Sequence, residues 1–367
     1  MLDWLQRVYD FLWGIPMITL LAGTGLYLTV SARFPQLRLF PKAFGLLGRK
    51  ESQGGITSFQ ALCTALAATV GTGNIVGVTG AICLGGPGAV FWMWLCGLLG
   101  MCTKFAEVTL ARRYRVLQNG EPVGGPMYMI TRGLPRKLHF LAPIYCAFGV
   151  IAAFGVGNAT QINAVVGAVN GLLSAFGGQE SSWGNLAVGL VLASAVGLVL
   201  FGGAKRIGAA AERMVPAASV GYVMLCVLVI FRCRERLPEA VRAIFVGAFR
   251  PRAVTGGCLG AAFGSLRTGC ARGIFTNEAG MGTASMAYAG AETGSPVELG
   301  MLGLVEVFVD TLVICTLTAL AVLTSGVAIP YGRDCGAELS TMVFSRVCGD
   351  WAAVCLAAFL AIFAFAT

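Results

Sequence analysis

The chain has 367 residues, of which 57% are hydrophobic and 12% charged, and its mean hydropathy is +0.79. Soluble domains carry about 25% charged residues, so this composition excludes an ordinary soluble protein and indicates a membrane protein with several spans. The net charge of +9 comes from Lys and Arg clusters between apolar segments, without interleaved aromatic residues. It predicts the orientation of the spans and no nucleic-acid partner.

Apolar stretches long enough for membrane helices recur along the whole chain. We predict nine spans, at residues 14–32, 56–84, 87–111, 140–173, 185–203, 214–231, 256–290, 299–325 and 351–367. Loops 33–55, 112–137 and 204–213 are basic and fall on one side, which the positive-inside rule makes cytoplasmic. Loop 232–255 is also basic, yet this count places it outside. Its middle section predicts an amphipathic helix on the membrane surface.

The second span is interrupted by TVGTGNIVGV at residues 69–78. Glycine inside a helix costs roughly 1 kcal/mol relative to alanine, so Gly71 and Gly73 around Thr72 predict that the helix opens there. Backbone groups freed within a bilayer are tolerated where they line a cavity or hold a ligand. The alternative is a helix contact packed closely through small residues.

Each half of such a broken helix would offer a different ligand set. The half after the break begins with the amides of Thr72, Gly73 and Asn74, which suit an anion such as a carboxylate. The half before the break ends with the carbonyls of Ala67 and Val70, which suit a sodium ion or an ammonium group.

A second glycine-interrupted span mirrors the first. Stretch 54–82 begins with two glycines, and stretch 256–284 begins with Gly256-Gly257 and is interrupted between Thr276 and Gly282. The two spans start from opposite sides of the membrane. Such a pair predicts an inverted-repeat transporter with its binding site at the midplane. Glu278 in the second interruption could be a counter-ion, a proton carrier, a partner of Arg272 or Arg267, or a solvated surface residue.

Other polar residues fall within predicted spans. Gln161 and Asn163 could contact a ligand or make interhelical hydrogen bonds worth about 0.6 kcal/mol. Asp310 and Glu306 are carboxylates within the eighth span. Glu107 follows Lys104 by three residues, which favours an ion pair along one helix.

A membrane enzyme, such as an intramembrane hydrolase, is a competing class. It would need a nucleophile–base pair or a metal site. His139 is the one histidine, the 13 cysteines form no CxxC pair, and neither HExxH nor GxSxG occurs. The sequence therefore predicts a protein that is not an enzyme.

Several blocks, in order, resemble the alanine or glycine:cation symporter family, the sodium:alanine symporters. The most specific is GGPGAVFWMWLCGLLG (Gly85–Gly100), which is similar to the family signature, with Gly97 where Ser, Thr, Ala or Val is expected. The others are TVGTGNIVGV at 69–78, GEPVGGPMYMI at 120–130, the region of Gln161, ARGIFTNEAGMGTA at 271–284 and EVFVDTLVICTLTA at 306–319. The resemblance covers essentially the whole chain.

The resemblance implies an all-α polytopic membrane protein of the leucine-transporter type, with two inverted five-helix repeats and one extra N-terminal span. On this basis we divide the chain into the extra span and cytoplasmic loop (1–55), the first repeat (56–231), an amphipathic external loop (232–255) and an incomplete second repeat (256–367). The family pattern has eleven spans against nine here, so we expect a C-terminally truncated sequence. An inactive remnant is therefore one alternative.

The resemblance also implies a function: sodium-coupled symport of a small neutral amino acid, alanine or glycine, by alternating access in a bacterial cell membrane. A proton-coupled amino-acid transporter, with Glu278 or Asp310 as the carrier, is a second alternative. Sodium would be co-transported, and we infer no obligate protein partner besides the membrane lipid.

The family match assigns residues to two ligands. Phe275 would limit side-chain size, and Gln161 with the backbone near Phe275 and Thr276 would meet the amino group or close the pocket. The expected substrate-binding residues are Gly71, Thr72, Gly73, Asn74, Gln161, Phe275, Thr276 and Asn277. The expected sodium-binding residues are Ala67, Val70, Ala364 and Thr367.

Overall fold

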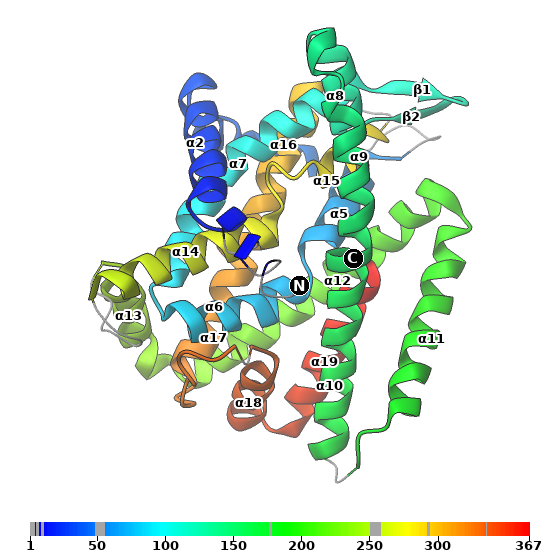
Figure 1. Ribbon diagram of the computed structural model, residues 1–367. Helices are drawn as coiled ribbons and strands as arrows, with labels where there is room; N and C mark the ends of the chain where they lie inside the picture. The colour runs from blue at the N-terminus through cyan, green and yellow to red at the C-terminus, as the bar shows by residue number, and fades with distance from the viewer. Residues whose placement is uncertain are drawn as a thin grey trace.

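The computed structural model describes residues 4, 7–8, 11–47, 56–175, 178–249, 258–291, 294–334 and 336–367. These residues form a helical bundle with one small hairpin (Figure 1). The first helices are α2 (Ile15–Ser31), α3 (Pro35–Arg38), α4 (Phe40–Leu47), α5 (Ser58–Thr69), η1 (Gly73–Gly77), α6 (Val78–Gly85) and α7 (Ala89–Tyr114).

The middle of the chain continues with α8 (Pro126–Gly133), η2 (Arg136–Leu138), α9 (Leu141–Ala152), η3 (Ala153–Ala159), α10 (Thr160–Ala175), α11 (Ser182–Leu200) and α12 (Gly203–Arg232). The remaining helices are η4 (Arg234–Arg236), α13 (Leu237–Phe249), α14 (Cys258–Asn277), α15 (Thr283–Ala289), α16 (Pro296–Val307), η5 (Phe308–Cys315), α17 (Thr316–Thr324), α18 (Gly336–Cys348) and α19 (Asp350–Ala366).

Five helices among the described residues are long and apolar enough to cross a membrane: Ala89–Tyr114, Arg136–Leu173, Ser182–Leu200, Gly203–Arg232 and Pro296–Thr324. The pair Ser58–Thr69 and Gly73–Gly85, bent by 49°, makes a sixth if it is one span. The predicted first and last spans coincide with shorter apolar helices, α2 and α19. A polytopic membrane protein is confirmed, and the count of nine spans stays a prediction.

Helix α7 lies at the centre of the packing and contacts α2, α14, α15 and α16. Small residues let the helix backbones approach closely. A Cβ added to Gly300 would lie 2.3 Å from Thr109 Oγ1, and one added to Gly269 would lie 2.3 Å from the Ala89 carbonyl oxygen. Close approach through glycine is the usual way in which membrane helices pack, and it fixes α14 and α16 against α7.

Helix α11 lies at the edge of the bundle (Figure 1). It is apolar throughout, yet none of its residues is buried within the chain. Apolar side chains exposed around a membrane-length helix are typical of a surface that faces lipid.

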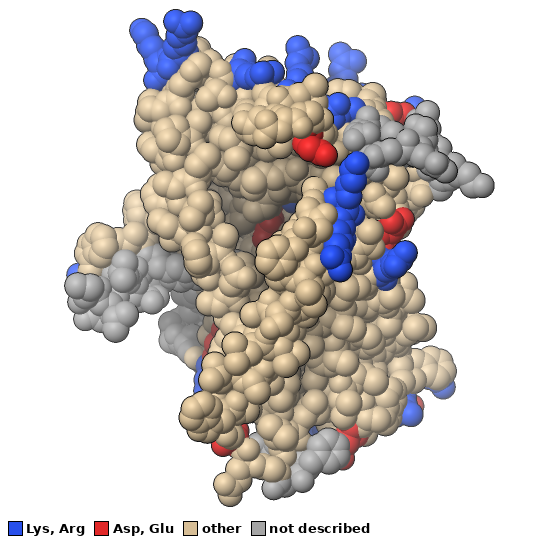
Figure 2. All heavy atoms as spheres, turned by 90° about the vertical axis from the view of Figure 1, so that its right-hand side faces the viewer, with Lys and Arg blue, Asp and Glu red and all other residues tan. Residues whose placement is uncertain are grey.

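The hairpin lies in the predicted basic loop 112–137. Its strands β1 (Val116–Gln118) and β2 (Glu121–Val123) pair antiparallel. Asn119 and Gly120 both have positive φ, at 51° and 82°, as a two-residue type I′ turn requires. Figure 2 shows Lys and Arg side chains gathered at the upper end of the molecule, where Figure 1 places this hairpin and α8, above a broad uncharged band. This distribution agrees with a basic cytoplasmic end.

A helix also forms in the predicted amphipathic loop. Ala240, Ile244 and Ala248 of α13 are buried at a spacing of four residues, and the helix packs on α7, α14 and α17. The glycine pairs at 54–55 and 256–257, which supported the repeat, lie outside the described residues. The division into two repeats therefore stays a prediction.

Candidate functional site

The helix formed by α5 and α6 is broken directly after Thr69. Val70 leaves the helical conformation, with φ −79° and ψ 94°. The amide of Gly71 would continue α5 by donating to the Ala67 carbonyl, but it donates instead to Asn74 Oδ1 at 2.9 Å. Because an asparagine side chain takes this amide, the carbonyl of Ala67 loses its helical donor. The predicted first interruption is confirmed, and its cause is local.

The amides after the break are used unequally. Asn74 N–H donates to the Gly71 carbonyl at 3.2 Å, so this amide closes the turn. Thr72 and Gly73 lie in the first turn of the new helix, where amides have no helical acceptor. Of the three predicted anion-binding amides, those of Thr72 and Gly73 therefore stay predictions, and that of Asn74 is taken by the Gly71 carbonyl.

Side chains from two other helices surround this break. The Thr72 hydroxyl donates to Gln161 Oε1 of α10 at 2.9 Å. A Cβ added to Gly73 would lie 3.2 Å from Thr276 Cγ2 and 3.6 Å from the Phe275 ring of α14. The structure thus brings α10 and α14 together at the first break, where the sequence predicts them. Their roles in substrate binding stay predictions.

A buried hydrogen-bond network runs from the first break toward the second. Asn74 is fully buried, and its Nδ2 lies 2.6 Å from Asp310 Oδ1 of η5. The Thr311 hydroxyl donates to Asp310 Oδ2 at 2.8 Å and accepts from Asn277 Nδ2 at 3.2 Å. Four side chains therefore link the two breaks, and this network supplies the contact of Asn277 with the site. Hereafter we call Asn74, Asp310, Thr311 and Asn277 the bridging network.

The second interrupted helix is also broken. Helix α14 ends at Asn277 and α15 begins at Thr283. Glu278, Gly280 and Gly282 between them have positive φ values of 51°, 87° and 89°. Glycine adopts this backbone region at little cost, so the predicted second interruption is confirmed.

Neighbouring side chains satisfy the backbone of the second break. Glu107 of α7 accepts hydrogen bonds from the amides of Gly280, at 3.0 Å, and Ser285, at 3.3 Å. The Tyr145 hydroxyl of α9 donates to the Met281 carbonyl at 3.1 Å. These contacts hold the turn from outside and leave fewer of its backbone groups for a ligand.

The charged residues near the second break are paired differently from the sequence expectation. The ion pair of Lys104 is with Glu306 of α16, with Nζ–Oε1 at 3.0 Å, because Glu107 is turned toward the second break. The predicted Lys104–Glu107 pair is thus replaced by a contact between helices.

Glu278 is not paired with Arg272, one of the partners that the sequence offered for it. Its carboxylate accepts a hydrogen bond from the Thr283 hydroxyl. Arg272 pairs instead with Asp334 of the loop before α18, with Nη2–Oδ2 at 3.1 Å. Of the alternatives left open for Glu278, the pair with Arg272 is therefore not the one that the structure has.

The predicted sodium residues meet at the end of α5. Thr367 Oγ1 lies 3.0 Å from the Ala67 carbonyl oxygen and 3.0 Å from the Phe363 carbonyl oxygen. Val70 is fully buried at the break, and Ala364 lines the same cavity as Ala67 and Thr367. Freed carbonyls of a broken helix are typical ligands for sodium in transporters. Whether these oxygens bind sodium stays a prediction.

A cavity of about 790 Å³ lies beside the first break. Its lining includes Ala67, Gln161 and Thr367 of the predicted site. It also includes Thr283 of α15 and Ile207 of α12. The cavity therefore joins residues of both predicted ligand sets to the first turns of α12. These turns are the segment 204–213, which the sequence predicts as a basic loop and which is helical in the structure.

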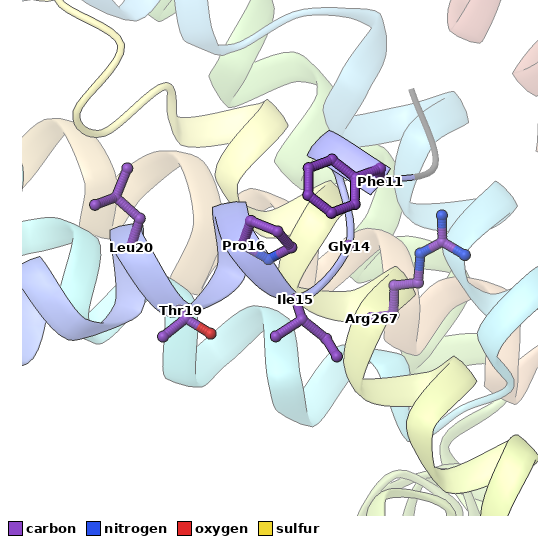
Figure 3. Close-up of a pocket in the computed structure, with 7 residues that line it drawn as sticks. All are labelled: Phe11, Gly14, Ile15, Pro16, Thr19, Leu20 and Arg267. Carbon is purple, nitrogen blue, oxygen red and sulfur yellow. The ribbon is translucent and has the colours of Figure 1, made fainter. Parts of the chain in front are cut away.

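A second hollow, of about 770 Å³, lies between α2 and α14 (Figure 3). It is lined by Phe11, Gly14, Ile15, Pro16, Thr19, Leu20 and Arg267. None of these lining residues belongs to the predicted substrate or sodium sets, so the cavity beside the first break is the candidate site.

The site predicted from sequence did not include two residues that the structure places in it. Thr311 joins the bridging network, and Glu107 holds the second break. Gly97 stands where the family pattern has a larger residue, and a Cβ there would lie 2.9 Å from Thr311 Cγ2. Gly97 is therefore the sequence signal that could have pointed to Thr311. The departure from the signature thus coincides with a close approach of α7 to η5.

Two broken helices that meet around a buried polar site, inside a bundle of membrane-length helices, define a secondary transporter. The model of the sodium:alanine symporter family matches residues 1–367. The chain belongs to the sodium:alanine symporter family.

Several longer relatives match over most of this chain, which spans about three quarters of their length. It is 41% identical to the sodium/alanine symporter AgcS of Methanococcus maripaludis over 353 residues, which cover 93% of this chain and 75% of the relative. It is 43% identical to an uncharacterised transporter of Haemophilus influenzae, covering 88% and 70%. It is 35% identical to the amino-acid carrier protein AlsT of Bacillus subtilis, covering 98% and 74%. This chain is thus a multi-pass membrane transporter with bacterial relatives, not an enzyme.

Proposed function

We propose that this protein transports alanine or glycine together with sodium, by alternating access, across a bacterial cell membrane. The observation that carries the proposal is the diversion of the Gly71 amide to Asn74 at 2.9 Å. This one hydrogen bond releases the carbonyl of Ala67 from the helical ladder on one side of the break, where it accepts from the Thr367 hydroxyl. It leaves the amides of Thr72 and Gly73 on the other side.

A small neutral amino acid is a zwitterion, and moving its charges out of water costs several kcal/mol per ion unless each finds a partner. The amides of Thr72 and Gly73, at the positive end of a helix, suit the carboxylate. Gln161, Phe275, Thr276 and Asn277 would enclose the remainder, with the Phe275 ring beside Gly73 limiting the side chain to a small one. This arrangement supports a small substrate over a large one.

Sodium would lie on the carbonyl side of the same break. The oxygens of Ala67 and Thr367, 3.0 Å apart, supply two of its ligands, and Val70 and Ala364 flank them. A cation bound there stabilises the conformation in which α5 and α19 are in contact. Such differential stabilisation of one state is what couples a sodium gradient to substrate movement.

The cavity supports alternating access. It extends from the first break to Ile207 and Met214 of α12, on the side of the predicted cytoplasmic loops. At the opposite end, the Arg272–Asp334 pair joins α14 to the loop before α18. We infer that this conformation opens the site to the cytoplasmic side.

Uptake of labelled alanine into proteoliposomes tests the function. We expect uptake with an inward sodium gradient and little with an equal potassium gradient. Equal uptake in the two salts would refute sodium coupling. Thr367→Val should weaken the apparent sodium affinity by about tenfold, since a hydrogen bond or ligand of this kind contributes about 1.5 kcal/mol. The matched control is Thr341→Val, because Thr341 makes a similar bond to the Ala337 carbonyl of α18, at 3.1 Å.

A further inference from the structure

Four charged side chains lie together beside the second break: Lys104 and Glu107 of α7 and Glu306 of α16, which are buried, and Glu278 of the break itself, which is half-buried. Lys104 and Glu306 are 0% exposed, and Glu107 is 9% exposed. Their charges act on one another. We call these four residues the Lys104 cluster, and the proposed transport function uses none of them.

The cluster is unbalanced in charge. Its one ammonium group faces three carboxylates, so full ionisation would leave two negative charges in excess. Asp310 of η5 adds another carboxylate near Glu306. An unpaired charge in a buried site is so costly that the group takes up a proton and becomes neutral. At least one carboxylate of the cluster is therefore expected to carry a proton.

Two tyrosines also face the cluster. The Tyr288 hydroxyl of α15 is fully buried beside Glu306 and makes no hydrogen bond within the described part of the chain. Tyr145 of α9 faces Glu107 and Glu278, and its hydroxyl donates to a backbone carbonyl. A fully buried hydroxyl beside Glu306, without a hydrogen bond of its own within the described residues, is an observation independent of the charge count: a proton held by Glu306 would find an acceptor there.

A path joins the cluster to the cavity. The Thr283 hydroxyl donates to the Glu278 carboxylate, and Thr283 also lines the cavity of about 790 Å³ beside the first break. A threonine hydroxyl both donates and accepts hydrogen bonds. One hydroxyl therefore separates Glu278 from the space that the substrate would occupy.

We propose that the Lys104 cluster is a proton-binding site that exchanges protons with the cavity through Glu278 and Thr283. A proton from water in the cavity forms an O–H bond with one carboxylate of the cluster, and the same bond breaks when the proton returns. Only the identification of the cavity with the transport path rests on the proposed function. Proton binding itself can be measured without transport.

Infrared spectroscopy of the reconstituted full chain tests proton binding directly. Exposed glutamates, with pKa about 4.3, are ionised at pH 7, so a protonated-carboxyl band at this pH reports a buried acid. We expect Glu278→Gln and Glu306→Gln each to remove or shift the band. Glu338→Gln, on the exposed face of α18, should leave it unchanged. A band that responds only to Asp310→Asn would place the proton outside the cluster and overturn the proposal.

A transport assay separates this proposal from the proposed function. At a fixed sodium gradient, uptake should vary with pH on the cavity side by up to about tenfold per pH unit, the limit for one proton. Glu278→Gln should flatten the profile, and Glu338→Gln should preserve it. Sodium-driven uptake that is independent of pH, together with no band, would overturn the proton site alone. A band that responds to the cluster variants, without sodium-driven uptake, would overturn the transport function alone.

Discussion

The two breaks differ in what holds them open. The first is held from within, because Asn74 takes the Gly71 amide three residues before it. The second is held from outside, by Glu107 of α7 and Tyr145 of α9, and three positive-φ residues form its turn.

This difference separates their tasks. The first break leaves backbone groups facing the cavity, because the Asn74 side chain accepts the Gly71 amide that would otherwise make a helical hydrogen bond. The second break has most of its turn satisfied by neighbours, and the side chains of Phe275 and Thr276, at the end of α14, lie against Gly73 instead. Two interruptions that look alike in sequence are therefore expected to respond differently to mutation.

Gly73→Leu should have the largest effect. A Cβ at this position already lies 3.2 Å from Thr276 Cγ2, and the rest of the side chain would fill the space over the first break. Overpacking of about 3 kcal/mol in the bound state would weaken alanine binding by roughly 100-fold or more, as measured by equilibrium binding to the purified protein.

Gly149→Leu is the matched control, because no atom lies within 4 Å of a Cβ at Gly149. This variant should insert into the membrane and bind alanine as the unmodified chain does. Unchanged alanine affinity in Gly73→Leu would contradict the assignment of the first break to the substrate.

Asn74→Ala should have an intermediate effect, mainly on stability. It removes the donor to a fully buried carboxylate, a contact of 2.6 Å, and a hydrogen bond to a charged group contributes up to about 3 kcal/mol. Thermal unfolding in detergent would measure the loss. Asn158→Ala, at an exposed asparagine, is the control. Adding Asp310→Asn should recover part of the stability, and a double variant less stable than Asn74→Ala would argue against this account.

Tyr145→Phe should have the smallest effect. It removes one neutral hydrogen bond of 3.1 Å to the Met281 carbonyl, worth about 1 kcal/mol, while Glu107 still holds the turn. Thermal unfolding would again report the change, beside Tyr27→Phe at a residue that is 69% exposed. If Tyr145→Phe were more damaging than Asn74→Ala, the second break would not be held by several redundant contacts.

The positions of both breaks could be predicted because a helix break depends on nearby glycines and polar residues. The hydrogen-bond partners that hold each break could not be predicted. Asn74 and Asp310 are 236 positions apart, and Glu107 and Gly280 are 173 positions apart. A single sequence does not say which distant helices become neighbours. For this reason the sequence predicts Glu107, three residues away, as the partner of Lys104, whereas the structure pairs Lys104 with Glu306.

The bridging network has a thermodynamic consequence. Asn74 shapes the break beside Ala67, and through Asp310 and Thr311 it is tied to Asn277 on the opposite helix. Two ligands that each bias such a shared element are bound cooperatively. If sodium raises the affinity for alanine by some factor, alanine must raise the affinity for sodium by that same factor. Isothermal titration in either order of addition should therefore return one coupling free energy.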